Sequence, residues 1–518
     1  MKLVNSILIL FIFSFHVYSQ PVLDWEYKNT AAYNYYPTTN ILHADQNSYI
    51  CSQSIDANNT AYIFRIDDDG NLLNQDSIHN FRYSILLNKR MVMDNNGSVY
   101  LCGSALNQQQ VGKIRLIKYD LLLNKTWDIT FMDSNSASYS LHGLLYSDTE
   151  DRIYLIGQKY DSASYASVIK IDPSGNVLWE SIDTIHNYIT IVTSSLDNDG
   201  NVILGGYSFA SGGADDFTIT KINTSGNIEW FVNEDGSEHS DDAVMDLCID
   251  DLNNIYAVGT FEDTVQKKIF KFDTDGNKLW SRNIYPVALP KITVDAAGST
   301  YITGFGPSFD HECIIYKYDS SGNFIRSNFS DIPDYKAYTS DYFVNIQTDD
   351  SANVYLLNNA DSSDNKKWFV AKFDSSLNLL WSFVYPRSIP NPSTSSSISL
   401  FEGGFTIAGA INNFGELRVV QFHETFPTAI IIPHVSPSFS FWPNPVSKKI
   451  SFELEKPDEG NFIFRLYDIQ SRLLMVKDVN LENRNSFVID IESVPNGLFL
   501  FNLQSEKQTY NGKLVKER

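Results

Sequence analysis

The chain has 518 residues, of which 43% are hydrophobic and 14% aromatic, and a formal net charge of −23 at pH 7. This length and apolar content are enough for a large core and exclude a disordered chain. The acidic balance would repel a phosphate backbone, so nucleic acid is excluded as a partner.

The N-terminal residues 1–19 read as a secretory signal peptide. Lys2 supplies the basic start, Ile7–Phe15 the apolar centre, and Val17–Ser19 a small-residue site ahead of Gln20. The apolar run is too short to span a bilayer, and no later run approaches that length. We therefore expect an exported mature chain without a transmembrane segment.

A strand-turn-strand segment is the unit from which most of the chain is built. In Lys170–Trp179 (KIDPSGNVLW) apolar and polar residues alternate on both sides of a turn. Pro173 sets φ at the start of this turn, and Gly175 accepts a positive φ. The third residue of the segment recurs at Asp67, Asp120, Asp172, Asn223, Asp273, Asp319 and Asp374. A strand-rich repeat of roughly 50 residues is typical of propeller blades.

A second motif precedes each of these hairpins and completes a four-stranded repeat. It reads DNDGNVILGGY at 197–207, and with degenerate copies it occurs eight times. The chain after His423 lacks an outer strand, whereas Val22–Tyr27 resembles Val177–Ile182. The N-terminal strand would therefore complete the last blade and remove a free sheet edge. We predict an all-β, eight-bladed propeller over residues 20–426, with seven blades as the alternative.

Recurring tryptophans support this register. Five of them, and Trp25 as a sixth member, occupy the same place in the repeat: Trp127, Trp179, Trp230, Trp280 and Trp381. A large ring at one fixed position in each blade favours packing between blades over a row of stacking platforms for a ligand.

Neither a metal nor a cofactor is expected. Turns such as Asp67–Asn71 begin like calcium loops, but they lack the acidic twelfth residue and the flanking helix. Their acids are predicted to shape the turns through hydrogen bonds to the backbone. The histidines are scattered without ligand spacing. The cysteines fall in apolar strand patterns and are predicted to be buried free thiols rather than disulfide or metal partners: Cys51, Cys102, Cys248 and Cys313.

The repeats resemble a known family. The runs VDAAGSTYITGF at 294–305 and LDNDGNVILGGYSFASGGADDFTITKINTSGNIEW at 196–230 are similar to the bacterial secreted β-propeller repeat, often called the SBBP repeat. The shared motifs are strands and turns, so the resemblance implies an architecture and no particular chemistry.

The C-terminal part changes character. Residues 427–439 are punctuated by Pro and Ser and read as a linker, and residues 440–518 carry short strands typical of a β-sandwich. This part resembles the type A C-terminal sorting domain of the type IX secretion system of Bacteroidetes. The residues that match its motifs include Pro443, Asn444, Pro445, Gly497, Gly512, Lys513 and Lys516. Ser471 stands where members usually have Gly.

That resemblance implies a route and a partner. The signal peptide would take the chain to the periplasm, and the type IX machinery would carry it to the outer-membrane surface or the medium. Members usually lose the sorting domain on the way.

The activity is the open question. The loops between the second and third strands and between blades should gather on one face, and variable loops on a rigid scaffold are where binding is usually found. The candidate ligand-binding residues there are Tyr35, Tyr36, Tyr338, Tyr342, Asp241 and Asp242. Solubilising charge and packing around the channel would explain the same residues. We expect a non-catalytic module for a glycan or protein, and no catalytic residue is singled out. The alternative is a hydrolase or lyase that degrades an extracellular polymer on the same face.

Overall fold

The computed structural model divides the chain into two compact units, Met1–Pro427 and Thr428–Arg518. It describes residues 21–29, 35–54, 60–81, 90–106, 112–131, 138–160, 164–183, 189–209, 214–236, 241–261, 263–284, 288–305, 313–330, 336–337, 345–362, 365–385, 394–411, 416–424, 439–443, 445–454, 461–468, 473–481, 486–505 and 509–517. The predicted signal peptide and nearly all of the predicted linker lie outside these residues. No helix in the described part of the chain has the length and apolarity needed to cross a membrane.

The first unit is a β-propeller, and its described residues form eight separate antiparallel sheets. In chain order these are β2 (Tyr35–Ala44), β3 (Asn47–Ser54), β4 (Ala61–Asp67), β5 (Leu72–Ile78); β6 (Met91–Met93), β7 (Val99–Leu106), β8 (Gly112–Tyr119), β9 (Lys125–Phe131); β10 (Ser138–Ser147), β11 (Arg152–Tyr160), β12 (Ser164–Ile171), β13 (Val177–Ile182); β14 (Ile189–Leu196), β15 (Val202–Phe209), β16 (Asp215–Ile222), β17 (Ile228–Glu234); β18 (Ala243–Ile249), β19 (Ile255–Phe261), β20 (Asp263–Phe272), β21 (Lys278–Ile284); β22 (Ala288–Val294), β23 (Thr300–Phe305), β24 (Cys313–Tyr318), β25 (Phe324–Ser330); β26 (Lys336–Ala337), β27 (Asn345–Thr348), β28 (Val354–Ser362), β29 (Asn365–Phe373), β30 (Leu379–Tyr385); and β31 (Thr394–Phe401), β32 (Gly404–Ile411), β33 (Glu416–His423) with β1 (Val22–Asn29).

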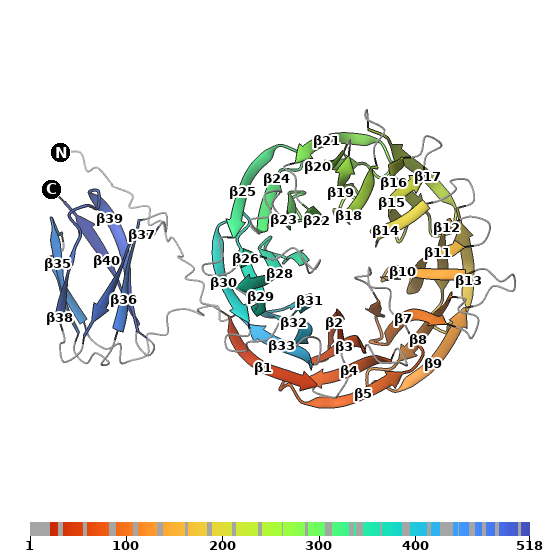
Figure 1. Ribbon diagram of the computed structural model, residues 1–518, viewed down its shortest axis with the longest axis horizontal. Helices are drawn as coiled ribbons and strands as arrows, with labels where there is room; N and C mark the ends of the chain where they lie inside the picture. Colours follow the sequence, from red (N-terminus) through yellow and green to blue (C-terminus); the bar gives the residue numbers. More distant parts are fainter. Residues whose placement is uncertain are drawn as a thin grey trace, which may run out of the picture. The chain divides into compact units, whose positions relative to one another are not determined.

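The sheets stand around a ring (Figure 1), each with its first strand near the centre and its last strand, such as β5, β13 or β30, at the rim. The hydrophobic core lies between the facing sides of neighbouring sheets. One cluster joins Tyr49 and Ile63 of the β2–β5 sheet to Val99 and Ile117 of the β6–β9 sheet. Each blade therefore depends on both neighbours to bury its apolar faces.

The N-terminal strand closes the ring, as predicted. β1 pairs antiparallel with β33, from Val22 opposite His423 to Asn29 opposite Leu417. Charged side chains join the same strands: Asp24 contacts His423, and Arg418 Nη1 lies 2.8 Å from Glu26 Oε1. Without β1, the edge of β33 would be exposed.

The acid-rich turns are shaped by their first aspartate, as predicted. In the turn after β12, Asp172 Oδ1 accepts hydrogen bonds from the backbone N–H groups of Ser174 and Asn176, both at 2.9 Å. These bonds, with that from the Asn176 amide, outweigh burial and lower the pKa of Asp172. The same pattern recurs at Asp67, Asp120, Asn223, Asp273, Asp319 and Asp374. The side-chain oxygens of these residues, an amide oxygen at Asn223 and carboxylate oxygens at the others, are occupied by their own turns.

Tryptophan and lysine side chains join several blades to the next one. Trp230 Nε1 and Lys221 Nζ both donate to the carbonyl of Thr274, in the β20–β21 turn of the next sheet, at 3.0 and 3.1 Å. The Trp230 ring also lies where a Cβ on Gly276 would stand, 2.8 Å from the nearest ring atom. The equivalent tryptophan–carbonyl bonds are Trp127 to Pro173, Trp179 to Thr224 and Trp280 to Ser320. The prediction that these rings pack between blades is confirmed.

The last such contact is made in a different way. The final blade has no third-to-outer turn, because its outer strand is β1, so no turn carbonyl is available there. The carboxylate of Glu424 takes that place. It accepts hydrogen bonds from Lys372 Nζ and, at 2.7 Å, from the Tyr355 hydroxyl. Trp25 packs over Gly70 as the other tryptophans pack over their glycines, which confirms it as a member of the series.

Cys51 and Cys102 are buried free thiols, as predicted, and Cys248 is a free thiol that is only partly buried. Burial raises the pKa of the Cys102 thiol. The side chain of Cys313 lies outside the described residues.

The second unit is a sandwich of two sheets around one core. Its strands are β34 (Phe439–Trp442), β35 (Lys449–Leu454) and β38 (Ser486–Asp490) in one sheet, and β37 (Leu473–Asn480), β36 (Asn461–Asp468), β39 (Gly497–Gln504) and β40 (Thr509–Lys516) in the other. Phe452, Phe464 and Phe501 meet between the sheets with ring centroids 5.0 to 5.9 Å apart. The predicted C-terminal sandwich is confirmed.

Candidate functional site

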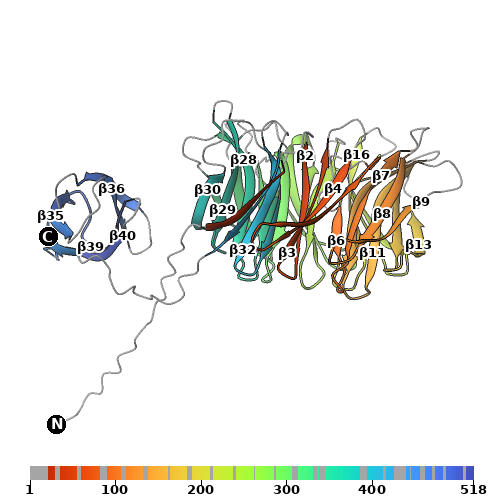
Figure 2. The same cartoon turned by 90° about the horizontal axis from the view of Figure 1, so that it is seen from below.

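The propeller has two unlike faces. Seen from the side (Figure 2), its strands run from one face to the other. The turn face carries the hairpin turns that join first to second and third to outer strands. The opposite face, here the variable face, carries the ends of the second strands and the starts of the third strands, where the repeats differ in sequence.

A hydrogen-bonded group of side chains lies on the variable face of the β10–β13 sheet. The hydroxyl of Tyr160, at the end of β11, donates to Gln158 Oε1 at 3.2 Å and lies 3.3 Å from Ser140 Oγ. Gln158 Nε2 donates to Ser164 Oγ at 3.0 Å and to the carbonyl of Ile189 at 2.6 Å. Gln158 is buried, whereas Tyr160 is 42% exposed. The aromatic ring at the surface is thus held by buried polar partners.

His142 joins the same group. It is the extra residue of a β-bulge in β10, because the pairing with β11 shifts between Leu141 and Gly143. Its Nε2 lies 3.0 Å from Ser140 Oγ. Burial lowers the pKa of His142 and outweighs hydrogen bonds to the Ile191 backbone and Gln158 that act in the opposite direction, so the ring is neutral near pH 7.

The neighbouring β14–β17 sheet carries an aromatic residue at the same place. Phe209 ends β15 as Tyr160 ends β11, and 56% of it is exposed. In the same sheet, Asn233 Nδ2 donates to Asp216 Oδ2 at 2.7 Å, and Ser208 Oγ donates to Asn233 Oδ1 at 3.2 Å. Two adjacent blades therefore present an exposed aromatic residue at equivalent ends of their second strands.

Acidic residues border this surface. Asp241 is exposed, and its Oδ1 lies 3.3 Å from the backbone nitrogen of Asp215, which donates to it. Burial, followed by the charges of Asp241 and Asp216, raises the pKa of Asp215. Asp242 is fully buried, and its Oδ2 accepts a hydrogen bond from the Gly236 backbone at 2.8 Å. The carboxylate of Asp242 is therefore bonded to the Gly236 backbone inside the protein, while Asp241 is exposed to solvent.

The predicted tyrosines are placed only in part. Tyr35 and Tyr36 begin β2, opposite Ser54 and Gln53, at the variable face. Tyr338 and Tyr342 lie outside the described residues. In the described part of the chain no group of histidine, cysteine and acidic side chains could hold a metal ion.

The sorting-motif residues of the second unit occupy different settings. Pro443 follows a cis peptide bond from Trp442, Pro445 is exposed, and Asn444 lies outside the described residues. Gly497 begins β39, and Gly512 and Lys513 lie within β40, where Lys513 stands opposite Leu500. Lys516 is buried, and its Nζ donates to the carbonyls of Glu492, at 2.9 Å, and Val494.

Comparison with known proteins identifies the second unit. Residues 440–517 match the family described as "Secretion system C-terminal sorting domain". The predicted type IX sorting domain is therefore confirmed. It marks the chain for handling by the type IX secretion system and for export to the cell surface or the medium. A comparison with curated protein sequences finds no match for the chain.

Solved structures similar to this chain include propellers of unrelated sequence. A eukaryotic initiation factor matches with a TM-score of 0.39 and 9% identity, over 67% of this chain and 87% of the other. The β-propeller domain of the Trilobed protease from Pyrococcus furiosus matches with 0.40 and 11%, over 67% and 98%. The polysaccharide lyase Uly1 matches with 0.42 and 8%, over 66% and 90%. Likenesses of this size carry no information on what this propeller binds or whether it is an enzyme.

Reasoning from the sequence missed the aromatic pair Tyr160 and Phe209. The two residues hold the same place in adjacent repeats, ten positions after Glu150 and Asp199 respectively in the printed sequence. The equivalent positions of these two aromatic residues could have been recognised in the sequence. The exposure of the two residues and the hydrogen bonds of Tyr160 depend on contacts between strands, which the sequence does not state.

Proposed function

We propose that the protein is an exported, non-catalytic binding module whose propeller recognises a glycan on the variable face. The observation that carries the proposal is the pair of exposed rings, Tyr160 and Phe209, at equivalent ends of neighbouring second strands. An aromatic ring packs against the apolar C–H face of a sugar, and nearby carboxylates and amides accept bonds from its hydroxyl groups. Asp241 is an exposed carboxylate on the same face.

The hydrogen bonds around Tyr160 support binding through preorganisation. Gln158 and Ser140 hold the Tyr160 hydroxyl through hydrogen bonds, and His142 contacts Ser140, so less conformational entropy remains to be lost when a ligand arrives. A neutral His142 adds no charge to this surface near pH 7. Tyr35, Tyr36, Tyr338 and Tyr342 remain proposed contributors from other blades.

A glycan array with the mature chain, residues 20–518, tests the proposal. We expect at least one carbohydrate to bind, and the double variant Tyr160→Ala/Phe209→Ala to lose that binding about tenfold or more, as expected when two ring contacts are removed. Leu279→Ala, which alters a side chain exposed on the outer strand β21, is the matched control and should bind normally. A second variant with Tyr35, Tyr36, Tyr338 and Tyr342 changed to Ala tests the tyrosine-loop assignment separately. Equal binding by the ring variant and the parent would contradict the proposed site.

The second candidate is an enzyme that degrades an extracellular polymer. It is favoured by the raised pKa of Asp215 beside the exposed Asp241, because acid catalysis needs a carboxyl group that keeps its proton. Turnover of a polysaccharide by the parent, lost in Asp241→Asn while glycan binding persists, would support this candidate over simple binding.

A further inference from the structure

The sorting unit needs a surface that the export machinery can contact, and its buried groups do not provide one. Lys516 belongs to the terminal motif, but its ammonium group is buried and bonded to two backbone carbonyls within the unit. An exposed apolar side chain, by contrast, loses water on contact and supplies binding energy. In the described residues of this unit the exposed large apolar side chains are Trp442, Leu474, Val476 and Val488.

Two of these four line up across one sheet. Trp442 lies opposite Ser451 in the pairing of β34 with β35, and Ser451 lies opposite Val488 in the pairing of β35 with β38. Residues directly opposite in neighbouring strands share one face of a sheet. Trp442 is 48% exposed and Val488 is 58% exposed. The small Ser451 therefore separates two exposed apolar side chains in a single row.

Polar residues border this row on both sides. Along the strands, Lys449 stands opposite Asp490, and Glu453 stands opposite Ser486. All four are exposed. An apolar centre with tryptophan as its largest member and a polar rim is the usual layout of a protein–protein interface.

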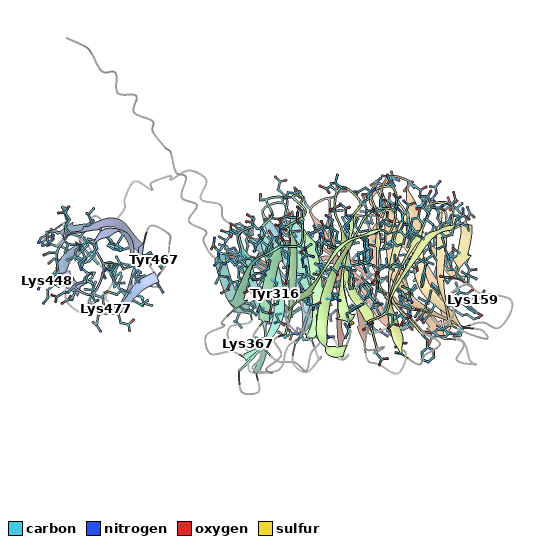
Figure 3. The ribbon with its side chains drawn as sticks, turned by 90° about the horizontal axis from the view of Figure 1, so that it is seen from above. Lys159, Tyr316, Lys367, Lys448, Tyr467 and Lys477 are labelled. Atoms are coloured by element: carbon cyan, nitrogen blue, oxygen red, sulfur yellow. The ribbon has the colours of Figure 1, made fainter. Side chains whose placement is uncertain are left out.

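The outer face of the other sheet is a weaker candidate. Leu474 and Val476 are exposed there on the edge strand β37, but the charged Arg465 stands directly opposite Val476, and Lys477 lies beside it in the same strand. Charged residues are depleted from interface centres. Lys448 directly precedes β35 of the first sheet, and Tyr467 lies in β36 of the other. Figure 3 labels both residues, on opposite sides of the unit, so the two faces can be altered separately.

We propose that the row Trp442–Ser451–Val488 is the surface by which the type IX export machinery holds this domain. The occupant is an apolar surface of a machinery protein that receives the Trp442 ring, with polar groups facing the rim. The match to the sorting-domain family indicates that another protein binds this unit, because a sorting domain acts by being bound. The proposal does not depend on what the propeller binds. Since the centre is uncharged, recognition should depend little on salt.

Export of the full chain in a strain with an intact type IX system tests this surface. We expect Trp442→Ser/Val488→Ser to reduce the exported fraction at least tenfold and to accumulate in the periplasm. Leu474→Ser/Val476→Ser is the matched control, since it removes two exposed apolar side chains from the other sheet, and it should be exported like the parent. Val488→Ser alone should give an intermediate loss. Resistance of the purified full chains to limited proteolysis, equal for all variants, separates loss of recognition from loss of folding.

Site-specific photo-crosslinking from position 488 identifies the occupant. A crosslink to a type IX protein, absent when the crosslinker stands at position 476, supports the proposal. Crosslinking to the propeller of the same chain, or to a second copy, would overturn it by naming another occupant. Normal export of Trp442→Ser/Val488→Ser, or an equal loss in the Leu474/Val476 variant, would also overturn it.

Discussion

At the scale of single residues, the turns show that different amino acids can occupy the same backbone position. In the turns that begin with the recurring Asp or Asn, the fourth residue has a positive φ, +75° at Gly298 and 59° at Ala352. Glycine adopts this conformation freely, whereas a residue with a Cβ pays a steric cost. The repeat therefore tolerates a strained residue at some turns because the aspartate bonds and the flanking strands hold the chain in place.

Exchanging the residues at these two positions should have opposite effects on stability. Gly298→Ala should lower the free energy of unfolding by about 1 kcal/mol or more, because alanine is strained at this φ. Its Cβ would also come within 3.1 Å of Ser320. Ala352→Gly should raise the free energy of unfolding by a few tenths to about 1 kcal/mol, because it relieves that strain. Urea unfolding of the two variants and the parent checks the signs, and a destabilised Ala352→Gly would contradict the argument.

Lys516 is predicted to act on the stability of the sorting domain. In Lys516→Met the carbonyl of Glu492 and the buried carbonyl of Val494 would lose their shared donor, which should cost about 1–3 kcal/mol. Hydrogen exchange in β38 and β39 of the full chain should quicken. Lys448→Met is the control, because Lys448 is exposed and pairs with Glu492 only at the surface. Unchanged exchange in Lys516→Met would assign this lysine some role other than folding.

At the scale of elements, the closing strand β1 should be among the most sensitive parts of the propeller. Trp25 is 7% exposed and belongs to the core cluster that joins the last blade to the first. Trp25→Ala should lower the free energy of unfolding by about 3–5 kcal/mol through the cavity it leaves. Val22→Ser, in the same strand but 46% exposed, should change it by less than about 0.5 kcal/mol. Chemical unfolding followed by circular dichroism compares them, and similar losses would mean that β1 acts only through its backbone.

Glu26 makes the closure sensitive to acid. Burial acts to raise its pKa, but hydrogen bonds from Tyr385 and Lys28 and the charge of Arg418 outweigh it, and the pKa lies below the ordinary 4.5. The carboxylate therefore adds stability above pH 4.5, and this contribution is lost as the pH falls through the lowered value of the folded state. Glu26→Gln should be less stable than the parent at pH 7, by no more than about 1 kcal/mol for this partly exposed group. The difference should disappear in the acid range, and melting curves between pH 3 and 7 would show it; a constant difference would exclude this linkage.

The elements that could be predicted from the sequence are those that repeat. A turn such as Asp172–Asn176 shapes itself through its own side chain, so its conformation is local and its period reveals the blades. The tryptophans recur at one position of the repeat, so they indicated the alignment of the repeats, and Trp25 could be assigned to the last blade in the same way. Glu424 could not be foreseen, because it occurs once and its partners, Tyr355 and Lys372, lie far away in the sequence.

The candidate site was harder to predict for a related reason. Asp242 and Asp241 are neighbours in an acidic loop, yet one is fully buried and the other exposed. Asp242 accepts a hydrogen bond from the Gly236 backbone, a contact that residue types alone do not predict. Composition identifies an acidic loop but does not say which carboxylate faces solvent.

At the scale of the whole molecule, apolar side chains are exposed at the first residues of the outer strands, beside the turn face. In the described residues, ten of them are 40–55% exposed: Val22, Leu23, Leu72, Leu73, Val177, Leu178, Leu279, Phe324, Ile325 and Leu379. They recur around the rim because the repeat itself recurs. Exposed apolar area promotes association between molecules.

Changing two adjacent exposed side chains of this rim should alter association between molecules without altering folding. Phe324→Lys/Ile325→Thr should lower light scattering at high protein concentration and leave the free energy of unfolding within about 0.5 kcal/mol of the parent. The partly buried Trp280 is left untouched, so contacts between blades persist. A large loss of stability would mean that these side chains support the ring itself.

The pairing of β1 with β33 also sets the order in which the protein can fold. Asp24 and His423 touch although 399 residues separate them, so the ring closes by one of the longest-range contacts that the chain could make. Contacts between distant residues form slowly, because the intervening chain must be ordered first. While the chain is being synthesised, its first strand has no partner until β33 has been made. The propeller therefore remains an open, edge-exposed chain during synthesis, and it becomes a closed ring only after nearly all of its blades have been made.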